Sequence, residues 1–409
     1  MSLYRYLPTP SDRMGIIWTL LSAEGAVVLE YGPAGTTHYS VGMYGSMGVA
    51  PNQSLFTTHL SEDDIVMGDV TRLEEAIIEV DKEYHPDTIF VVSSSVASII
   101  GTDIKGVCNY MKHEVEATLI PVDTGGFKGD YTYGMREGYS LLVKTFCKEA
   151  VEKKTSTYNI LGASGYHYRM KSDIWEIKNL MKDSFDYECN GILGIDSSVT
   201  TLKNFGAAEV NLVLRQEALP AAEYLKETYG TPYIYGAPYG YQGTTKWLEE
   251  VAKVTEKNIA DEVQKTLSMR KMESAGYKMY AAMYASKEIT PAAVVAGDYD
   301  MVKGFSNICE EIALPVELKV SNHSLAGLEA EDMMRTESEK EKIELLTDVK
   351  YRLVFGDDIS LHMCDDTNEK VICAYPLIGR SQIATHIPFM GIRGMDYLLE
   401  TVERYYSRL

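Results

Sequence analysis

The sequence predicts an α/β fold in which parallel β-sheets are flanked by helices. Short apolar runs rich in Val, Ile and Leu alternate with longer segments whose apolar residues recur at helical spacing. Gly-rich or Ser-rich turns follow several of the apolar runs. Strands that alternate with helices pair in parallel, because each helix carries the chain back across the sheet in a right-handed crossover.

The first unit shows this alternation clearly. Pro86 and Asp87 break a helical segment before the β-rich run from Thr88 to Val92. We expect a helix over 73–84, a strand over 88–92, a helix through Cys108 and Met111, a strand over 117–122, a loop over 123–129 and a helix over 133–153.

Two further units follow in the same style, without a recognisable sequence repeat. The charge-rich segment 329–348 predicts a solvated helix rather than a docking site. We expect strands over 158–162, 191–194, 210–214, 231–234, 292–298, 316–320, 351–355 and 371–373. We expect helices over 172–185, 221–229, 244 to about 287 and 302–313, and a terminal helix after residue 386.

Length and composition indicate a folded protein of two or three domains. The 409 residues are 45% hydrophobic and 24% charged. The formal net charge of −20 argues against binding to nucleic acid or an anionic membrane, since both need a positive surface. The apolar run from Met14 to Leu21 is too short to span a bilayer, so we expect a cytoplasmic protein.

The six cysteines are spread along the chain without a CxxC pair or a neighbouring Cys/His group. Such spacing indicates reduced, buried thiols rather than a disulfide framework or a zinc site. They are Cys108, Cys147, Cys189, Cys309, Cys364 and Cys373.

Five segments near the N-terminus carry a family resemblance. They are Met14-Gly15-Ile16-Ile17, Gly32-Pro33-Ala34-Gly35-Thr36-Thr37-His38-Tyr39, Leu60 to Gly68, Val91 to Ser95, and Ile100 to Ile104. Their order and spacing resemble the N-terminal signature of the nitrogenase component 1 family. This family comprises the two subunits of the nitrogenase catalytic protein, their assembly scaffolds and related tetrapyrrole reductases. Weaker agreement over 231–245, 351–358 and 386–394 extends the resemblance over almost the whole chain.

The resemblance implies three Rossmann-like domains. We expect an N-terminal α/β domain over 1–155, a second α/β domain with a long connecting helix over 156–285, and a third over 286–385. The C-terminal helix, 386–409, is expected to pack back on the first domain. The family also implies a homodimer or a heterodimer with a homologous subunit, served by a separate ATP-dependent iron–sulfur reductase. No GxGxxG or P-loop motif is present, so we expect no nucleotide in this chain.

In the family, cysteines in three of these segments bind an iron–sulfur cluster between subunits. The matching residues here are Met14, Thr36 and Ser95, which are poor substitutes for thiolates. We therefore expect no metal held by this chain alone, and a cluster only where a partner subunit shares it. Gly32 and Gly35 are expected to contribute backbone N–H groups at the same place, where strand ends meet helix N-termini.

Other candidate residues have a functional and a structural interpretation. Asp103 matches an acidic position of the family, but a negative charge at a helix N-terminus is its commoner role. His386 and His38 have the side chain of a proton donor or metal ligand, yet each stands alone in the sequence. Around Leu214, where the family's cofactor cysteine falls, there is no thiol. We therefore do not expect the nitrogenase cofactor or dinitrogen reduction.

Two functions stay open at this point. The chain is either a component 1 type subunit of an oxidoreductase that receives electrons from the reductase, or a non-catalytic scaffold. The scaffold would bind a metallocluster or tetrapyrrole, or act as a structural partner subunit. Tyr31, Tyr39, Tyr235, Tyr239 and Tyr241 fall at predicted loop edges and suit either a flat ligand or a subunit interface.

Overall fold

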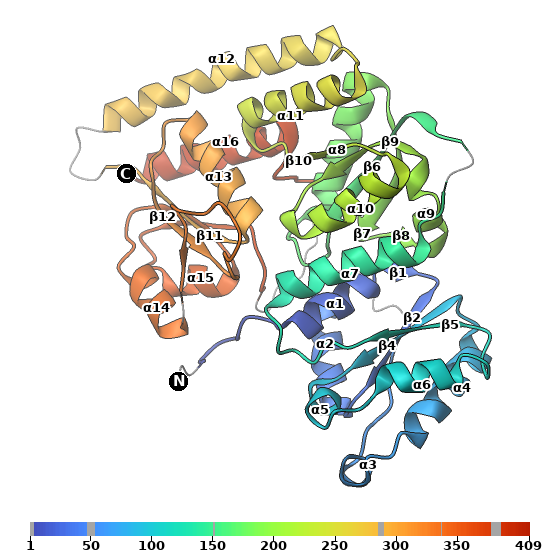
Figure 1. Ribbon diagram of the computed structural model, residues 1–409. Coiled ribbons are helices and arrows are strands. Elements are labelled where there is room, and N and C mark those ends of the chain that lie inside the picture. The colour runs from blue at the N-terminus through green and yellow to red at the C-terminus, as the bar shows by residue number, and fades with distance from the viewer. Residues whose placement is uncertain (1–3, 47–53, 150–151, 285–289, 337, 378–385) are drawn as a thin grey trace.

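Three parallel sheets follow one another along the chain (Figure 1). The computed structural model describes residues 4–46, 54–149, 152–284, 290–336, 338–377 and 386–409. The arrangement of sheets and flanking helices confirms the predicted α/β class. Within these ranges, every helix is too short or too polar to cross a bilayer.

The first sheet has the strand order β3 (Leu55–Thr57), β2 (Ala26–Tyr31), β4 (Thr88–Ser93), β5 (Thr118–Val122). β2 and β4 are mostly apolar and are buried throughout, because helices cover both faces of the sheet. One face packs on α1 (Asp12–Leu20) and α7 (Tyr131–Phe146), and the other on α4 (Thr71–Tyr84) and α6 (Ile104–Met111). The remaining helices are α2 (Ala34–Ser46), α3 (Glu62–Met67) and α5 (Ser95–Ile99).

The second sheet has the order β10 (Tyr233–Tyr235), β9 (Ala208–Val213), β6 (Lys154–Ala163), β7 (Glu188–Gly194). Its helices are α8 (Met170–Phe185), α9 (Val199–Lys203), α10 (Leu219–Tyr229) and α11 (Gly240–Thr255). A small ribbon of β1 (Ala23–Glu24) and β8 (Ser197–Ser198) ties the first unit to the second.

The third sheet has the order β13 (Met334–Arg335), β12 (Val316–Ser321), β11 (Ala293–Gly297), β14 (Leu353–Gly356), β15 (Glu369–Ile372). Its helices are α13 (Tyr299–Glu311), α14 (Glu339–Thr347) and α15 (Asp358–Met363). Helix α12 (Asp261–Tyr284) connects the second unit to the third, and α16 (Gly391–Arg408) ends the chain.

Each sheet reverses its strand order once, and ligands of open α/β sheets bind at the carboxyl ends of the strands at such a reversal. The reversal lies between β2 and β4 in the first sheet, between β6 and β9 in the second, and between β11 and β14 in the third. These three strand edges are therefore the places where a site is expected.

The terminal helix corrects one prediction. Within the described residues α16 does not pack back on the first unit: it packs against α8 and α11 of the second and also contacts α12. Its apolar side chains Met395, Leu398 and Val402 belong to the core that joins the second and third units. The Asp173 carboxylate of α8 also accepts hydrogen bonds from Phe389 N and Met390 N, at 2.7 and 3.0 Å, just before the helix starts.

Three helix predictions differ from the structure in length. The helix expected over 244–287 is two helices, because Glu256 has a φ of 55° and ends α11 in the left-handed conformation. The helix expected over 133–153 ends at Phe146, and among the described residues of the segment 329–348 only α14 is helical. The boundary predicted at 285 lies outside the described residues.

Candidate functional site

The turns in which the resemblance predicts the family's cluster position lie at the strand-order reversal of the first sheet. We call this region the signature edge and define it as residues 31–37 and 93–98 with Arg13 and Met14 of α1. Gly32 joins its two turns: a Cβ atom on Gly32 would lie 2.7 Å from Ser94 Oγ and 3.5 Å from Thr36 Oγ1. The close approach of the Gly-rich and Ser-rich turns therefore requires a glycine here.

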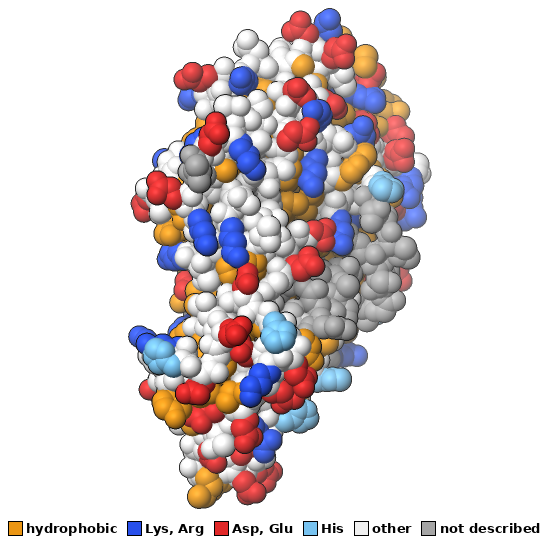
Figure 2. Space-filling model, turned by 90° about the vertical axis from the view of Figure 1, so that its right-hand side faces the viewer, with side chains coloured by type: hydrophobic (Ala, Val, Ile, Leu, Met, Phe, Trp, Pro, Cys, Tyr) orange, Lys and Arg blue, Asp and Glu red, His pale blue; other side chains and the backbone are white. Residues whose placement is uncertain are grey.

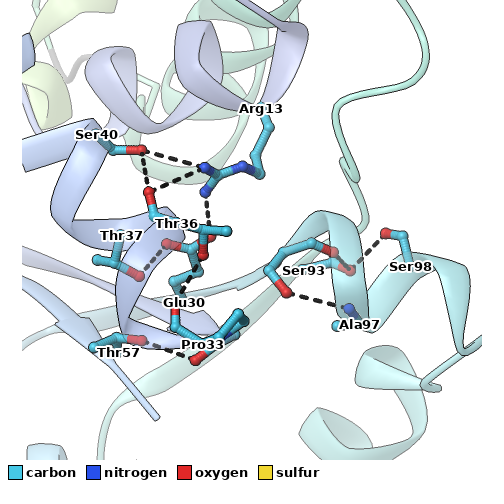
Figure 3. Close-up of polar contacts among 12 residues, drawn as sticks. Arg13, Glu30, Pro33, Thr36, Thr37, Ser40, Thr57, Ser93, Ala97 and Ser98 are labelled. Carbon is cyan, nitrogen blue, oxygen red and sulfur yellow. Dashed lines mark hydrogen bonds and ion pairs between the residues drawn. The ribbon is translucent and has the colours of Figure 1, made fainter. Parts of the chain in front are cut away.

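A buried ion pair lies inside the signature edge (Figure 3). The Arg13 guanidinium donates to the Glu30 carboxylate, whose second oxygen accepts from Thr37 Oγ1 at 2.5 Å. Another Arg13 nitrogen lies 3.3 Å from both Thr36 O and Ser40 Oγ. Arg13 is 5% exposed and Glu30 is fully buried. The pair and its hydrogen bonds thus tie α1, β2 and α2 together in an environment that excludes water.

The serine hydroxyls of the signature edge form hydrogen bonds with neighbouring groups of the chain. Ser93 Oγ lies 2.7 Å from Ser98 Oγ, and Ser94 Oγ accepts from Ala97 N at 3.2 Å and caps α5. Ser95 is half-buried and faces Gly126, where a Cβ atom would lie 3.2 Å from Ser95 Oγ. These contacts are typical of a well-packed turn at the end of a strand.

The side chains of the signature edge do not fit an iron–sulfur cluster held by this chain. Met14 is buried in α1, and Thr36 Oγ1 donates to Pro33 O at 2.8 Å. Iron–sulfur clusters are held by thiolates, and neither residue supplies one. Over the described ranges, no three His, Cys, Asp or Glu side chains gather in a way that could hold a metal ion.

The remaining predicted residues lie apart from the ion pair. Gly35 is exposed, and a Cβ atom there would meet nothing within 4 Å. Asp103 is exposed and caps α6 by accepting from Gly106 N at 2.8 Å. His386 is exposed beside Trp175, with the ring centroids 6.0 Å apart. The structure gives Asp103 a capping role and places His386 at the surface of the second unit.

A second polar centre was missed from the sequence. The carboxyl ends of β11 and β14 face the N-terminus of α7, and we call this meeting place the junction. The Tyr131 hydroxyl of α7 donates to Asp298, which follows β11, and the rings of Tyr131 and Tyr166 lie 4.6 Å apart. Asp357, which follows β14, is fully buried. The junction therefore joins all three units, because Tyr166 follows β6.

A cavity of about 470 Å³ opens at the junction. Its walls come from the N-terminal segment 4–11, the turn 126–131, and residues 321–324, 335–336 and 338–342 of the third unit. This volume suits a small organic or inorganic ligand. The position outside the strand ends of the third sheet is the one that such ligands occupy in open α/β folds.

The carboxylates of the cavity are already hydrogen-bonded by the protein. Asp130 accepts from Ser324 N at 2.7 Å, and Asp357 lies 3.4 Å from Lys342 Nζ. Glu339 accepts from the backbone N–H groups of Arg5 and Tyr6 and so holds the N-terminal segment over the third unit. Arg335 also lines the cavity. It is exposed and has no hydrogen-bond or ion-pair partner within the described part of the chain.

Behind the cavity lies a group of buried ionisable side chains. Arg215, which closely follows β9, donates to Tyr239 Oη at 2.9 Å, while its Nε and Nη1 have no partner within the described residues. Burial raises the pKa of Glu217 to about 7 and lowers the pKa of His167 well below its usual value. His167 is therefore neutral at neutral pH, and Glu217 changes from its ionised to its neutral form as the pH falls through about 7.

The junction does not fit a thiolate-held cofactor either. Leu214 and Arg215 stand where the family resemblance predicts the cofactor cysteine, and Arg215 is a cation. Burial raises the pKa of the Cys373 thiol well above its usual value, which disfavours the thiolate. Both ring nitrogens of His323 are engaged: Nε2 accepts from Tyr299 N at 2.9 Å, and Nδ1 lies 2.8 Å from Ser324 O.

The raised pKa of Glu217 predicts a pH-dependent stability. Between about pH 4.5 and pH 7 the folded chain holds a proton that the unfolded chain releases, so this group makes the chain less stable as the pH rises through that window. We expect Glu217→Gln to flatten the pH dependence there. Urea unfolding at several pH values checks this, with Asp103→Asn as the control. If stability depended on pH in the same way in the Glu217 variant and in the natural chain, the raised pKa of Glu217 would be contradicted.

The junction had a signal in the sequence. Two predicted strands end at Gly-Asp pairs, Gly297-Asp298 and Gly356-Asp357. A third pair, Gly129-Asp130, directly precedes α7. Strand ends of one parallel sheet share an edge, so the first two pairs belong together. Nothing in the sequence showed that the third pair, more than a hundred residues away, would face them.

Fold and site together define a protein of three α/β units with a buried polar junction between them. The family model described as nitrogenase component 1 type oxidoreductase matches residues 11–405. The chain belongs to this family.

Several relatives show how near this chain stands to particular proteins. It is 29% identical to the nitrogenase iron-molybdenum cofactor biosynthesis protein NifE of Nostoc sp., over 61% of this chain and 54% of that protein. It is equally similar to NifE of Methanococcus maripaludis, over 71% and 66%. The nitrogenase molybdenum-iron protein alpha chain of Clostridium pasteurianum is 27% identical over 58% and 47%. The matches thus span about half to two thirds of these relatives.

A solved structure, "Nitrogenase Cp1 at pH 6.5", shares the fold over the whole of this chain and 94% of its own, with a TM-score of 0.79 and 16% identity.

Proposed function

We propose that this chain is a non-catalytic partner subunit of a component 1 type assembly and that it contributes no ligand to a metal cluster. The observation that carries the proposal is the buried Arg13–Glu30 pair. It lies beside Met14 and Thr36, where the family resemblance expects two of the cluster cysteines. The similarity to proteins named for cofactor biosynthesis supports a scaffold role over a catalytic one.

Exposed apolar side chains around the signature edge support pairing with a homologous subunit. Ile99 at the end of α5 is 73% exposed, and Phe127 in the turn after β5 is 67% exposed. Figure 2 shows further hydrophobic side chains at the lower tip, which α3 forms in Figure 1 and where Val66 and Met67 are 82% and 78% exposed. Exposed apolar side chains on an otherwise acidic chain support the proposal of an interface here.

The junction cavity gives the subunit a place for a small ligand. Lys342 and Asn322 are polar side chains on one wall, where Lys342 Nζ donates to Asn322 Oδ1 at 3.0 Å, and Tyr131 and Tyr166 form an aromatic wall. The ligand would bind through oxygen atoms and a flat or apolar body. A tetrapyrrole or a smaller cofactor precursor belongs to this chemical class.

The test compares iron and sulfide in the anaerobically purified chain, alone and with a co-purifying homologous subunit. We expect the chain alone to lack both, and the pair to contain them. The triple variant Met14→Ala/Thr36→Ala/Ser95→Ala is expected to leave the iron content of the pair unchanged. Loss of iron from a pair that still co-purifies and unfolds at the same temperature would show that this chain supplies a ligand.

The second candidate is a subunit that takes part in electron transfer from an ATP-dependent iron–sulfur reductase. The family description as an oxidoreductase and the match over 11–405 favour it. Reduction of the purified pair by such a reductase and ATP, followed in the visible spectrum, separates the two functions. An ATP-dependent bleaching that the triple alanine variant abolishes would support electron transfer through this chain and overturn the scaffold role.

A further inference from the structure

The N-terminal segment crosses from the first unit to the third and forms one wall of the junction cavity (Figure 1). We call residues 4–10 the strap. All of its side chains are exposed or half-buried, so none of them belongs to a core. Five of its residues line the cavity: Tyr4, Leu7, Pro8, Thr9 and Pro10. This wall can therefore move without the loss of core packing, which is typical of segments that open locally.

One buried carboxylate holds the far end of the strap. Glu339, the first residue of α14, accepts hydrogen bonds from the backbone N–H groups of both Arg5 and Tyr6, the second at 2.9 Å. Glu339 is 8% exposed. The Tyr6 ring also lies edge-on to His362, with the ring centroids 5.9 Å apart. A charged acceptor forms hydrogen bonds roughly twice as strong as a neutral one, so Glu339 supplies the main attachment at this end.

The middle of the strap is attached more weakly than its two ends. Thr9 Oγ1 lies 3.5 Å from Asn322 O, a distance at which a hydrogen bond is weak. Pro8 and Pro10 have no backbone N–H group to donate to a neighbouring strand. At the near end, Tyr131 N donates to Pro10 O at 2.9 Å and ties the strap to the first unit. The far end is thus the one that a single side chain can release.

We propose that the strap opens and closes the junction cavity, with Glu339 as its latch and Pro10 as its fixed end. Release of the two hydrogen bonds to Glu339 frees residues 4–9 to move away from the third unit and uncovers the cavity. Their return encloses a bound ligand, as lids do in many ligand-binding proteins. This inference rests on the function proposed above, in which the junction cavity takes a small ligand, and adds how that ligand enters and is retained.

Cleavage by trypsin after Arg5 measures the opening without any ligand, because the rate of cleavage follows the population of the open state. We expect the full chain with Glu339→Gln to release the peptide 1–5 about tenfold faster than the natural chain, since a neutral amide with one acceptor oxygen holds the two N–H groups less well. Glu344→Gln removes the same charge from an exposed position of α14 and should leave the rate unchanged. Equal release from the natural chain and from Glu339→Gln would overturn the latch.

A thiol in the cavity wall tests whether the strap covers the cavity. Ile359 lines the cavity and is 6% exposed. In a chain with Ile359→Cys, we expect N-ethylmaleimide to modify position 359 about tenfold faster when Glu339→Gln is added, and mass spectrometry follows the modification. Circular dichroism checks that the two variants are folded alike. Equal rates of modification would overturn the role of the strap as a cover, even where trypsin cleaves faster.

Failure of this inference and failure of the proposed function can be told apart with protoporphyrin IX, a flat tetrapyrrole whose fluorescence reports binding. If it binds, Glu339→Gln should raise both its association and its dissociation rate, as expected when opening limits both steps. Unchanged rates would overturn the strap and leave the cavity as a ligand site. If the probe does not bind while the trypsin and maleimide results hold, the strap stands and the tetrapyrrole is removed from the proposed ligands.

Discussion

Replacing Arg13 with Met is expected to destabilise the chain by about 3–5 kcal/mol, the usual cost of leaving a buried charge without its partner. The substitution keeps most of the side-chain volume but removes the guanidinium from the fully buried Glu30 carboxylate. Thr37 would still donate one hydrogen bond. Urea unfolding followed by circular dichroism measures the loss.

Two further variants show whether the loss comes from the pair. Arg13→Met/Glu30→Gln should recover most of the stability, because replacing both charged partners removes the uncompensated charge. Lys182→Met breaks exposed ion pairs with Asp186 and Glu188 and should cost far less, because exposed pairs are screened by water. An Arg13→Met loss as small as the Lys182→Met loss would mean that the pair is not shielded from water.

The local pattern of the sequence predicted the fold class because each element has its own signal. The strand predicted over 88–92 corresponds to β4, and the helix predicted over 73–84 corresponds to α4. Helix ends were predicted less well, since Glu256 ends α11 by adopting a backbone conformation that its side chain does not favour. The elements on which α16 packs could not be predicted either. An apolar stripe shows that one face of a helix is buried, but it does not show which elements cover that face.

The candidate site, like the fold, was predicted only in part from the sequence. The Gly32 turn and the Ser95 turn were recognised because each follows an apolar run, and both belong to the signature edge. The Arg13–Glu30 pair was not recognised, because Glu30 lies in an apolar strand and gives no sign of its partner. Asp298, Arg215 and Tyr131 belong to three different units, and their convergence depends on how the units pack. Single-sequence patterns carry no information on that packing.

Replacing Gly134 with Ala is expected to cost about 3 kcal/mol, the upper end of the usual range for overpacking. Gly134 of α7 faces α1 at the crossing of the two helices, where an added Cβ atom would lie 1.8 Å from Asp12 O. The same crossing brings a Cβ on Gly15 within 2.0 Å of Tyr131 O. Because backbone cannot yield as a flexible side chain does, the helices must move apart.

That movement should also reach the junction, since α7 begins with Tyr131, whose ring packs against Trp18 and Tyr166. We therefore expect Gly134→Ala to change the aromatic circular dichroism of the folded chain as well as its unfolding midpoint. Gly243→Ala is the matched control: this glycine of α11 has no neighbour within 4 Å of an added Cβ atom, so alanine should be neutral or stabilising. Equal unfolding free energies for the two variants would contradict the close crossing of α1 and α7. A destabilised Gly134 variant with an unchanged aromatic spectrum would instead separate the helix crossing from the geometry of the junction.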